Sequence, residues 1–333
     1  MMFFKGGLKA AILGFAVVAG AVSASAQEVV LSAGTESNED GLYYKTLVLI
    51  DDQLREKTGG KVSFKIYPNQ QLGNELSMIE GLRNGSLDVA IAGGGNFASF
   101  VPAFQLFSVP YVFKDYETYR AAMAPDSKVW ALMQQKVSEA ELGLQLVAPT
   151  TVGSRWFANT KGEVTKPEDI KALNVRMRVQ ANPIEAEVWG TYGAIPVNMP
   201  MPEVVAAMRQ GVVEAVENAP DILSTYKIQE TAKYMARTDH SFYVAVVLIG
   251  DAAMNKVPED LRAAVKEAFA AGGQALLDAS VEAQAKAIEA LKADGAIISE
   301  VDKAAFREPL APLYEKVSKD VNAEDILAAI QAL

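Results

Sequence analysis

The sequence predicts an α/β protein built from two domains. Segments typical of strands alternate along the chain with segments typical of helices, which favours layered α/β architecture. The 333 residues are enough for two domains that each bury a core of their own. One pattern occurs twice, in Leu82–Ala90 and Met208–Val216: a helix end, a capping glycine, an acidic residue and a strand. The repetition favours two similar domains facing one cleft, although such junctions are common in any α/β protein.

The first 26 residues are expected to lie outside the fold. Lys5 and Lys9 give a positive start, Ala10–Val22 is an apolar run, and Ala24-Ser25-Ala26 is a small-x-small cleavage site. These features are typical of a secretory signal peptide cleaved after Ala26. The apolar run is too short to span a bilayer comfortably, which favours export over a membrane anchor. We therefore expect a periplasmic protein that is not embedded in the membrane.

The next part of the chain shows clear strand and helix signals. Val62, Phe64 and Ile66 alternate with polar residues, as in a half-buried strand. Gly85 stands where a left-handed cap would end a helix. The predicted elements are, in order, a strand over Val29–Ser32, a helix over Asp40–Lys57, a strand over Lys61–Tyr67, a helix over Asn74–Asn84 and a strand over Leu87–Ala92.

Further along, Leu142–Ala148 and Val152–Ala158 are typical of strands. From Pro258 to about Lys292 the chain is rich in Ala, Glu, Lys and Leu, interrupted only by Gly272-Gly273. This composition predicts one helix of roughly 50 Å, at 1.5 Å per residue. A helix of that length would overrun one domain and could brace two. A short strand over Ala296–Val301 and a terminal helical region follow.

Composition excludes several classes of function. The chain has no cysteine, so disulfides, thiolate metal sites and cysteine nucleophiles are excluded. With His240 as the only histidine, a multi-histidine zinc site is excluded too. A net charge of −10 argues against non-specific nucleic-acid binding, which needs a basic face. We expect no metal and no cofactor.

Enzyme motifs are scarce in the sequence. It contains no P-loop, no nucleophile elbow and no dinucleotide fingerprint, since Gly93-Gly94-Gly95 lacks the required spacing. Asp239 and Ser241 flank His240, but sequence neighbours rarely provide the geometry of a catalytic triad. The sequence therefore predicts a protein that is not an enzyme.

Arginines in apolar surroundings are the most informative polar residues. Arg155 lies between Gly153 and Trp156-Phe157, which suggests partial burial, and a buried guanidinium needs an anion or several acceptors. Arg176 and Arg178 stand two apart in a strand-like run, so they share a face. A guanidinium near an amide such as Asn218 can hold a carboxylate, because its planar fork matches two oxygens.

Short motifs spread over nearly the whole chain carry a family resemblance. In order and spacing, the sequence from about Leu31 to Val321 resembles the solute-receptor subunit of TRAP (tripartite ATP-independent periplasmic) transporters. The motifs are Ala33-Gly34, Tyr67-Pro68, Gln71-Leu72-Gly73, Leu82–Asp88, Val109-Pro110-Tyr111, Gly153-Ser154-Arg155, Pro167–Lys171, Val175-Arg176, Gly193-Ala194, Glu203-Val204 and Glu217-Asn218.

The resemblance implies a two-domain periplasmic-binding-protein (Venus flytrap) fold with a long domain-spanning helix. The first domain is expected over residues 27–152 plus about 244–283, and the second over 153–243 plus about 284–333. The implied function is capture of a small organic acid, such as a C4-dicarboxylate or a sugar acid, by domain closure. The partner would be a TRAP-type, ion-coupled membrane permease.

The resemblance also implies site residues. Arg176 matches the arginine that clamps the ligand carboxylate, Arg155 a second arginine near it, and Asn218 an asparagine that hydrogen-bonds there. Arg178 is a secondary candidate, and the sequence leaves open whether Arg176 or Arg178 points into the cleft. The remaining candidates are Ser32, Glu75, Asn96 and Met201.

The chain also departs from family patterns. Relatives that bind sialic acid use an asparagine where this chain has Ser32, and a glutamate and an arginine where it has Gly93 and Asn96, which argues against sialic acid. Glu214-Ala215 and the alanine after Asn218 also depart from the usual residues. Three alternatives stay open: an ABC-type receptor for a sugar or amino acid, an exported enzyme acting on a carboxylate, and a sensory receptor.

Overall fold

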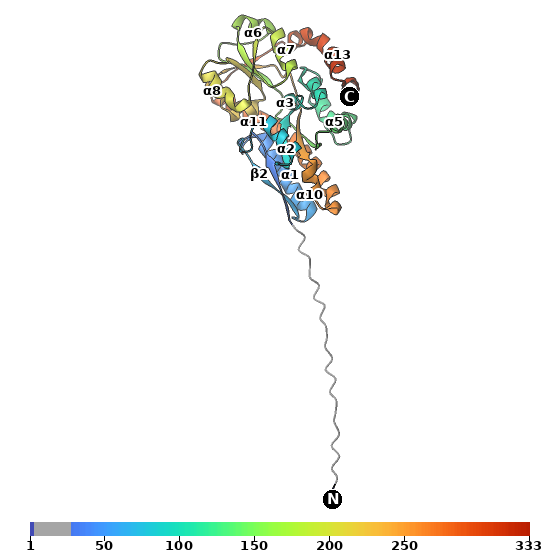
Figure 1. Ribbon diagram of the computed structural model, residues 1–333. Coiled ribbons are helices and arrows are strands. Elements are labelled where there is room, and N and C mark those ends of the chain that lie inside the picture. The colour runs from blue at the N-terminus through green and yellow to red at the C-terminus, as the bar shows by residue number, and fades with distance from the viewer. Residues whose placement is uncertain (3–27) are drawn as a thin grey trace.

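The structure is a computed structural model that describes residues 1–2 and 28–333 (Figure 1). The predicted signal peptide and its cleavage site fall almost entirely outside the described residues. None of the helices in the described part of the chain is long and apolar enough to cross a membrane. The described chain forms two α/β lobes, with α1, α2 and α10 on one and α6, α7 and α8 on the other.

The first lobe is built on a five-stranded sheet in the order β2-β1-β3-β10-β4. β1 is parallel to β2 and β3, whereas β10 runs antiparallel to β3 and β4. The strands are β1 (Val29–Gly34), β2 (Val62–Tyr67), β3 (Val89–Gly93), β4 (Leu144–Thr150) and β10 (Ala245–Gly250). The helices with this lobe are α1 (Leu42–Thr58), α2 (Glu75–Asn84), α3 (Gly94–Phe97), α4 (Tyr116–Ala122), α5 (Lys128–Glu139) and α10 (Asp251–Lys256), with the 3-10 helix η1 (Pro102–Ser108).

The second lobe is built on a six-stranded sheet in the order β11-β9-β5-β8-β6-β7. Its strands are β5 (Trp156–Asn159), β6 (Arg176–Val179), β7 (Ile195–Asn198), β8 (Ala215–Asn218), β9 (Tyr234–Arg237) and β11 (Ile297–Glu300). Its helices include α6 (Pro167–Leu173), α7 (Pro183–Thr191), α8 (Val204–Arg209), α9 (Pro220–Thr225), α12 (Lys303–Arg307) and α13 (Ala311–Asp320), with the 3-10 turns η2 (Met201–Glu203), η3 (Ile228–Glu230) and η5 (Glu308–Leu310).

The repeated sequence pattern corresponds to the same structure in both lobes. Gly85 ends α2 and Gly211 follows α8, and both adopt positive φ, at 77° and 67°. The following strands, β3 and β8, each pair in parallel with a neighbouring strand. The predicted α/β class with two sheets is therefore confirmed.

Two chain segments join the lobes, and one helix braces them. The crossings run from β4 to β5 and from β9 to β10, and an antiparallel bridge joins Ser154 to Phe242. The strand predicted over Val152–Ala158 begins only at Trp156, because Gly153 takes φ +91° and breaks the extended run. The long helix α11 (Arg262–Ala293), preceded by η4 (Glu259–Leu261), packs on α1 and β4 and also on α9 of the second lobe.

The chain ends back on the first lobe. The sequence predicted residues 284–333 in the second domain, whereas α14 (Glu324–Gln331) packs against α5. Ile326 and Ile330 join the same apolar cluster as Met133 of α5. The apolar face of the short helix α14 is therefore buried against the first lobe. The sequence does not mark this return of the chain across the lobe boundary.

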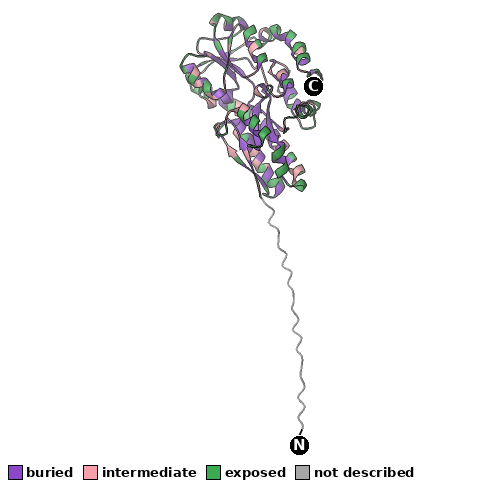
Figure 2. Cartoon of the chain, viewed as in Figure 1, coloured by how far each residue is buried: buried purple, intermediate pink, exposed green. Residues whose placement is uncertain are grey.

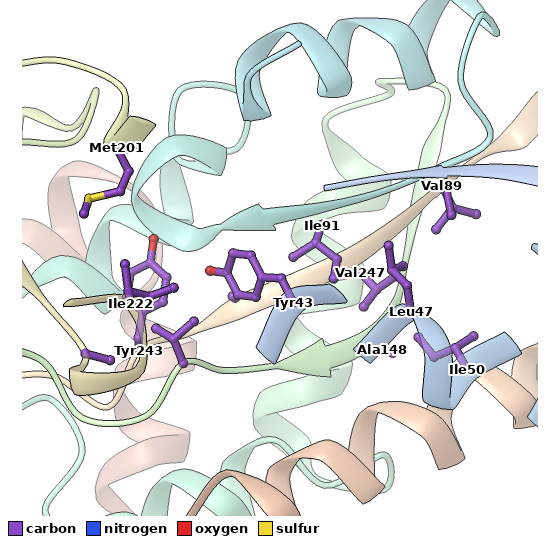
Figure 3. Close-up of a cluster of buried hydrophobic side chains, with 14 of the residues drawn as sticks. Tyr43, Leu47, Ile50, Val89, Ile91, Ala148, Met201, Ile222, Tyr243 and Val247 are labelled. Carbon is purple, nitrogen blue, oxygen red and sulfur yellow. The ribbon is translucent and has the colours of Figure 1, made fainter. Parts of the chain in front are cut away.

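Buried residues line both sheets, and exposed ones cover the outer helices (Figure 2). One apolar cluster is continuous from the first lobe to the second, since it holds Leu47 and Val89 as well as Val216 and Met235. Figure 3 shows Met201, Ile222, Tyr43 and Tyr243 together at one end of this cluster. That end is where the two lobes face each other and where polar side chains gather.

Candidate binding cavity

A small cavity of about 40 Å³ lies between the two lobes. The first lobe contributes carboxyl, hydroxyl, amide and aromatic side chains, the second contributes an arginine, two amides and three apolar or aromatic side chains, and the crossings contribute Val152, Arg155 and Tyr243. Its lining is Glu36, Ser37, Tyr43, Glu75, Asn96, Val152, Arg155, Arg178, Gln180, Met201, Asn218, Ile222, Tyr226 and Tyr243. Of the eight site residues predicted from the sequence, six are brought together here and two are not.

Arg178 is the guanidinium that the cavity leaves available. It lies near the carboxyl end of β6, where ligands of parallel sheets usually bind. The residue is only 2% exposed, and its Nε donates to the carbonyl of Met199 at 2.9 Å. Its Nη1 is buried and has no hydrogen-bond partner among the described residues. A buried donor without an acceptor is costly, so this atom is suited to receive a ligand oxygen.

Arg176, which the resemblance predicts to be the clamp, lies outside the cavity lining. Its side chain is 45% exposed and bonded to Glu214, with Nη2 at 2.5 Å from Oε1 and also 2.5 Å from the carbonyl of Gly211. Two residues span only about 7 Å along a strand, yet this step separates the outer end of β6 from its cavity end. Of the two arginines left open by the sequence, Arg178 therefore faces the cavity.

Arg155 borders the cavity, but its charge is already neutralised. Nε and Nη2 both bond the carboxylate of Glu217, and Nη2 also donates to the Glu217 carbonyl at 3.1 Å. The ring of Tyr243 covers the guanidinium at 4.2 Å. Burial would raise the pKa of Glu217, but Arg155 and then His240 hold this pKa well below its usual range. Arg155 is thus committed to a buried ion pair.

His240 belongs to this network and not to a catalytic triad. Its Nε2 lies 3.2 Å from Glu217 Oε2, and its Nδ1 lies 2.8 Å from Thr238 Oγ1. Asp239 instead accepts from Ser154 Oγ and Trp156 Nε1. Glu217 belongs to one of the family motifs, but its pairing with Arg155 is not marked in the sequence, because β8 and β5 meet only in the folded sheet.

Two carboxyl groups stand on the first-lobe wall. Glu75 Oε2 accepts from the backbone of Gly93 and from Asn96 Nδ2, both at 2.9 Å. Glu36, which the sequence reading missed, accepts from the Glu75 backbone at 2.8 Å. Burial and then the charge of Glu75 raise the pKa of Glu36 to about 7, and burial raises the pKa of Glu75 as well. Glu36 lies in the loop after β1, where no local pattern marks it as a site residue.

Asn218 and Met201 line the second-lobe wall. Within the described part of the chain, Asn218 Nδ2 has the sulfur of Met201, at 3.5 Å, as its one acceptor, and its Oδ1 accepts from Ala219 N. A thioether is a weak acceptor, so this amide donor is available for a better one. Ser32, also predicted as a site residue, is absent from the cavity lining: its hydroxyl bonds Asp88, which is paired with Lys256.

Hydrogen bonds between the lobes hold the cavity shut. The segment 180–182, directly after β6, makes four of them: Gln180 Nε2 to Tyr243 Oη at 2.6 Å, Ser99 Oγ to the Ala181 carbonyl at 3.0 Å, Ala181 N to Asn96 Oδ1 at 3.3 Å, and Asn182 Nδ2 to Ser108 Oγ at 2.7 Å. On another side, Leu42 N donates to Asp221 at 3.3 Å. The structure thus shows the two lobes closed over the cavity.

The three consecutive glycines, Gly93–Gly95, form a surface without side chains, the glycine seat, against which residues of the second lobe pack. A Cβ on Gly93 would lie 1.9 Å from Tyr243 Oη, and one on Gly95 would lie 2.4 Å from Gln180 Oε1 and 2.7 Å from Glu185 Oε1. The missing side chains let Gln180 and Glu185 of the second lobe approach the backbone of α3. Within residues 1–2 and 28–333, no group of three or more His, Cys, Asp or Glu side chains could hold a metal ion.

The sequence was compared with known protein families. Residues 33–320 match the bacterial extracellular solute-binding proteins, family 7. The chain belongs to this family. The resemblance to TRAP solute receptors seen in the motifs is therefore confirmed, and so is the predicted fold.

Curated members of family 7 that are similar to this chain carry different ligand names. The 2,3-diketo-L-gulonate-binding periplasmic protein of Escherichia coli is 28% identical over 303 residues, 90% of each chain. The C4-dicarboxylate-binding periplasmic protein of Rhodobacter capsulatus is 27% identical over 297 residues, 84% of each chain.

Solved structures of family 7 agree in fold. A TRAP periplasmic solute-binding protein from Polaromonas with D-erythronate is 28% identical, with a TM-score of 0.82, covering 92% of this chain and 99% of its own. One from Xanthobacter autotrophicus with β-D-galacturonate is 26% identical, with a TM-score of 0.84 and the same coverage.

Proposed function

We propose that this family 7 protein is the periplasmic receptor that captures a small organic acid for a TRAP-type membrane permease. The observation that carries the proposal is Arg178: a buried guanidinium with an unpartnered Nη1, facing a cavity closed by both lobes. An ion-paired hydrogen bond to a carboxylate contributes about 1.5–3 kcal/mol. Relatives with bound erythronate and galacturonate support an acid as the ligand.

The proposed mechanism is capture by closure. Arg178 lies on β6, and the next residues, 180–182, carry the bonds to the first lobe. A carboxylate held by Arg178 would therefore stabilise the strand end that fastens the lobes together. Asn218 is the second donor in this scheme, while Glu75, Asn96 and Met201 shape the opposite sides. A ligand that binds the closed state better shifts the open–closed equilibrium toward it.

The permease would recognise the closed state of the receptor. The chain would reach the periplasm by export and cleavage after Ala26. We propose no enzymatic activity. The relatives are solute-binding proteins, and the single histidine is engaged by Glu217 and Thr238. Arg155 in this scheme positions the cavity wall through Glu217 and does not clamp the ligand.

A pair of arginine variants tests the proposal. A thermal-shift screen over organic acids identifies a ligand, since binding stabilises the folded state by RT ln(1 + [L]/Kd). Calorimetry then compares Arg178→Ala with Arg176→Ala as the matched control on the same strand. We expect a loss of affinity of about tenfold or more for Arg178→Ala only. Unchanged affinity in Arg178→Ala would exclude the clamp, and a screen without any ligand would contradict acid capture itself.

A further inference from the structure

Charges in the cavity are unevenly divided between its two sides. Two arginines border it, but Arg155 is neutralised by a bidentate bond to Glu217 and shielded by Tyr243. Among the residues that the structure describes, Arg178 alone keeps a buried donor without a partner. The cavity therefore has one position at which a ligand carboxylate meets an unpaired cation.

The first-lobe wall offers acceptors in place of a second cation. Glu36 and Glu75 both line the cavity, and they are fixed relative to each other by the bond from Glu75 N to Glu36 Oε1 at 2.8 Å. Gly93 N and Asn96 Nδ2 both donate to the same oxygen of Glu75, Oε2. No hydrogen bond from the described residues reaches the other oxygen, Oε1. This wall can accept hydrogen bonds from a ligand, and it repels negative charge.

From this arrangement, and resting on the proposed capture of an organic acid, we infer that the ligand carries a single carboxylate and presents hydroxyl or amino groups to Glu36 and Glu75. Arg178 binds the carboxylate, and the two glutamates accept hydrogen bonds from the hydroxyl or amino groups at the other end of the ligand. Glu36 and Glu75 are thus specificity-determining residues that reject a second carboxylate.

The rejection follows from desolvation as well as repulsion. A second carboxylate would lose its water inside a closed cavity and find carboxyl oxygens where it needs donors. A hydroxyl group in the same place donates to a carboxyl oxygen and leaves no buried group unpaired. Sites built to pair with a polar group of the ligand discriminate strongly against ligands that cannot pair.

Matched acids test the inference. Galactonate and galactarate share a six-carbon chain and differ at one end, which is a CH₂OH group in the first and a second carboxylate in the second; threonate and tartrate form the same pair with four carbons. Calorimetry at pH 8 should show the monocarboxylate of a pair binding about tenfold tighter or more. Equal or tighter binding of the dicarboxylates would overturn the inference.

Variants assign the discrimination to residues. Glu36→Gln removes the negative charge but keeps the shape of the side chain. In whichever acid pair binds more tightly, it should reduce the ratio of monocarboxylate to dicarboxylate affinity by about tenfold. Glu75→Gln should act in the same direction, and it provides the test if Glu36→Gln proves unstable by circular dichroism. Glu39→Gln, three residues from Glu36 and exposed, is the control that should keep the wild-type preference. Unchanged preference in both cavity variants would contradict the assignment.

The result separates the two proposals. If only dicarboxylates stabilise the protein in the thermal-shift screen, organic-acid capture stands and the single-carboxylate inference falls. If no acid binds at all, both fall.

Discussion

Arg155 and Glu217 form a buried bidentate ion pair at the point where both crossings meet the second sheet. The two side chains are 4% and 2% exposed. On the neighbouring strand β6, Arg176 forms a pair of the same type with Glu214, with side chains 45% and 16% exposed. The molecule thus contains a buried and an exposed version of one interaction.

The buried pair should be far more sensitive to the loss of one partner. Arg155→Met leaves the Glu217 charge uncompensated in the interior, which typically costs about 3–5 kcal/mol. Arg176→Met, the control, should cost no more than about 1 kcal/mol. Urea unfolding followed by circular dichroism measures both. Similar losses in the two variants would show that solvent reaches Glu217.

The sequence predicted the elements better than the site. Alternation in Val62, Phe64 and Ile66 and the glycine caps Gly85 and Gly211 are local signals, and each gave the correct element. Which arginine faces the cavity depends on where β6 begins relative to β7 and β8, and this register is a property of the whole sheet. The motif match therefore favoured Arg176, whereas the fold selects Arg178.

The partners of Glu36, Glu217 and Glu185 could not be predicted for a related reason. Each of these glutamates is one acidic residue among the 41 of the chain, and its role arises from partners far away in sequence. Glu185 approaches the backbone of the first lobe because Gly95 has no side chain there. The sequence shows three glycines, but it does not show which residues occupy the space they leave.

Glu185 should make stability depend on pH near neutrality. Burial and then the charge of Glu217 raise its pKa to about 7, against the opposing effects of Arg155, the Gln180 backbone and Arg178. The folded state therefore holds this proton more tightly than the unfolded state, so the stabilisation is complete below about pH 4.5 and is lost as pH rises through 7. Glu36 contributes in the same direction.

Glu185→Gln mimics the protonated form and should flatten this profile. We expect the wild type to lose about 1–3 kcal/mol more than the variant between pH 5 and pH 8 in urea unfolding. Glu217 acts with the opposite sign, because its lowered pKa contributes stability above about pH 4.5 that is lost on further acidification. If the free energy of unfolding of the variant falls as steeply as that of the wild type between pH 5 and pH 8, the pKa of Glu185 is not raised in the folded state.

Gly95→Ala should impair closure and leave the separate lobes intact. The new Cβ would meet Gln180 Oε1 and Glu185 Oε1, both of the second lobe, at 2.4 and 2.7 Å. Overpacking costs about 1–3 kcal/mol, and here it acts only when the lobes are together, so ligand affinity should fall about 5- to 150-fold. Small-angle scattering should show a more open average shape without ligand. Ligand affinity and scattering equal to those of the wild type would show that the close contact at Gly95 does not control closure of the lobes.

Gly272 and Gly273 are the positions where the long helix α11 touches the first lobe most closely. A Cβ on Gly272 would lie 2.6 Å from Ile50 Cγ1 and 2.8 Å from the Ile50 backbone nitrogen, and one on Gly273 would lie 2.5 Å from the carbonyl of Pro149.

Glycine inside a helix is normally worse than alanine by up to about 1 kcal/mol, so an alanine would be expected to stabilise α11. Here the neighbouring atoms include backbone of α1 and β4, which cannot rotate away, so both substitutions should destabilise by about 1–3 kcal/mol. Gly190→Ala in α7, where nothing lies within 4 Å of the new Cβ, is the matched control and should be neutral or stabilising. Thermal and urea unfolding of the three variants decide the point, and stabilisation by either α11 substitution would mean that the helix does not lie as close to α1 and β4 as the structure shows.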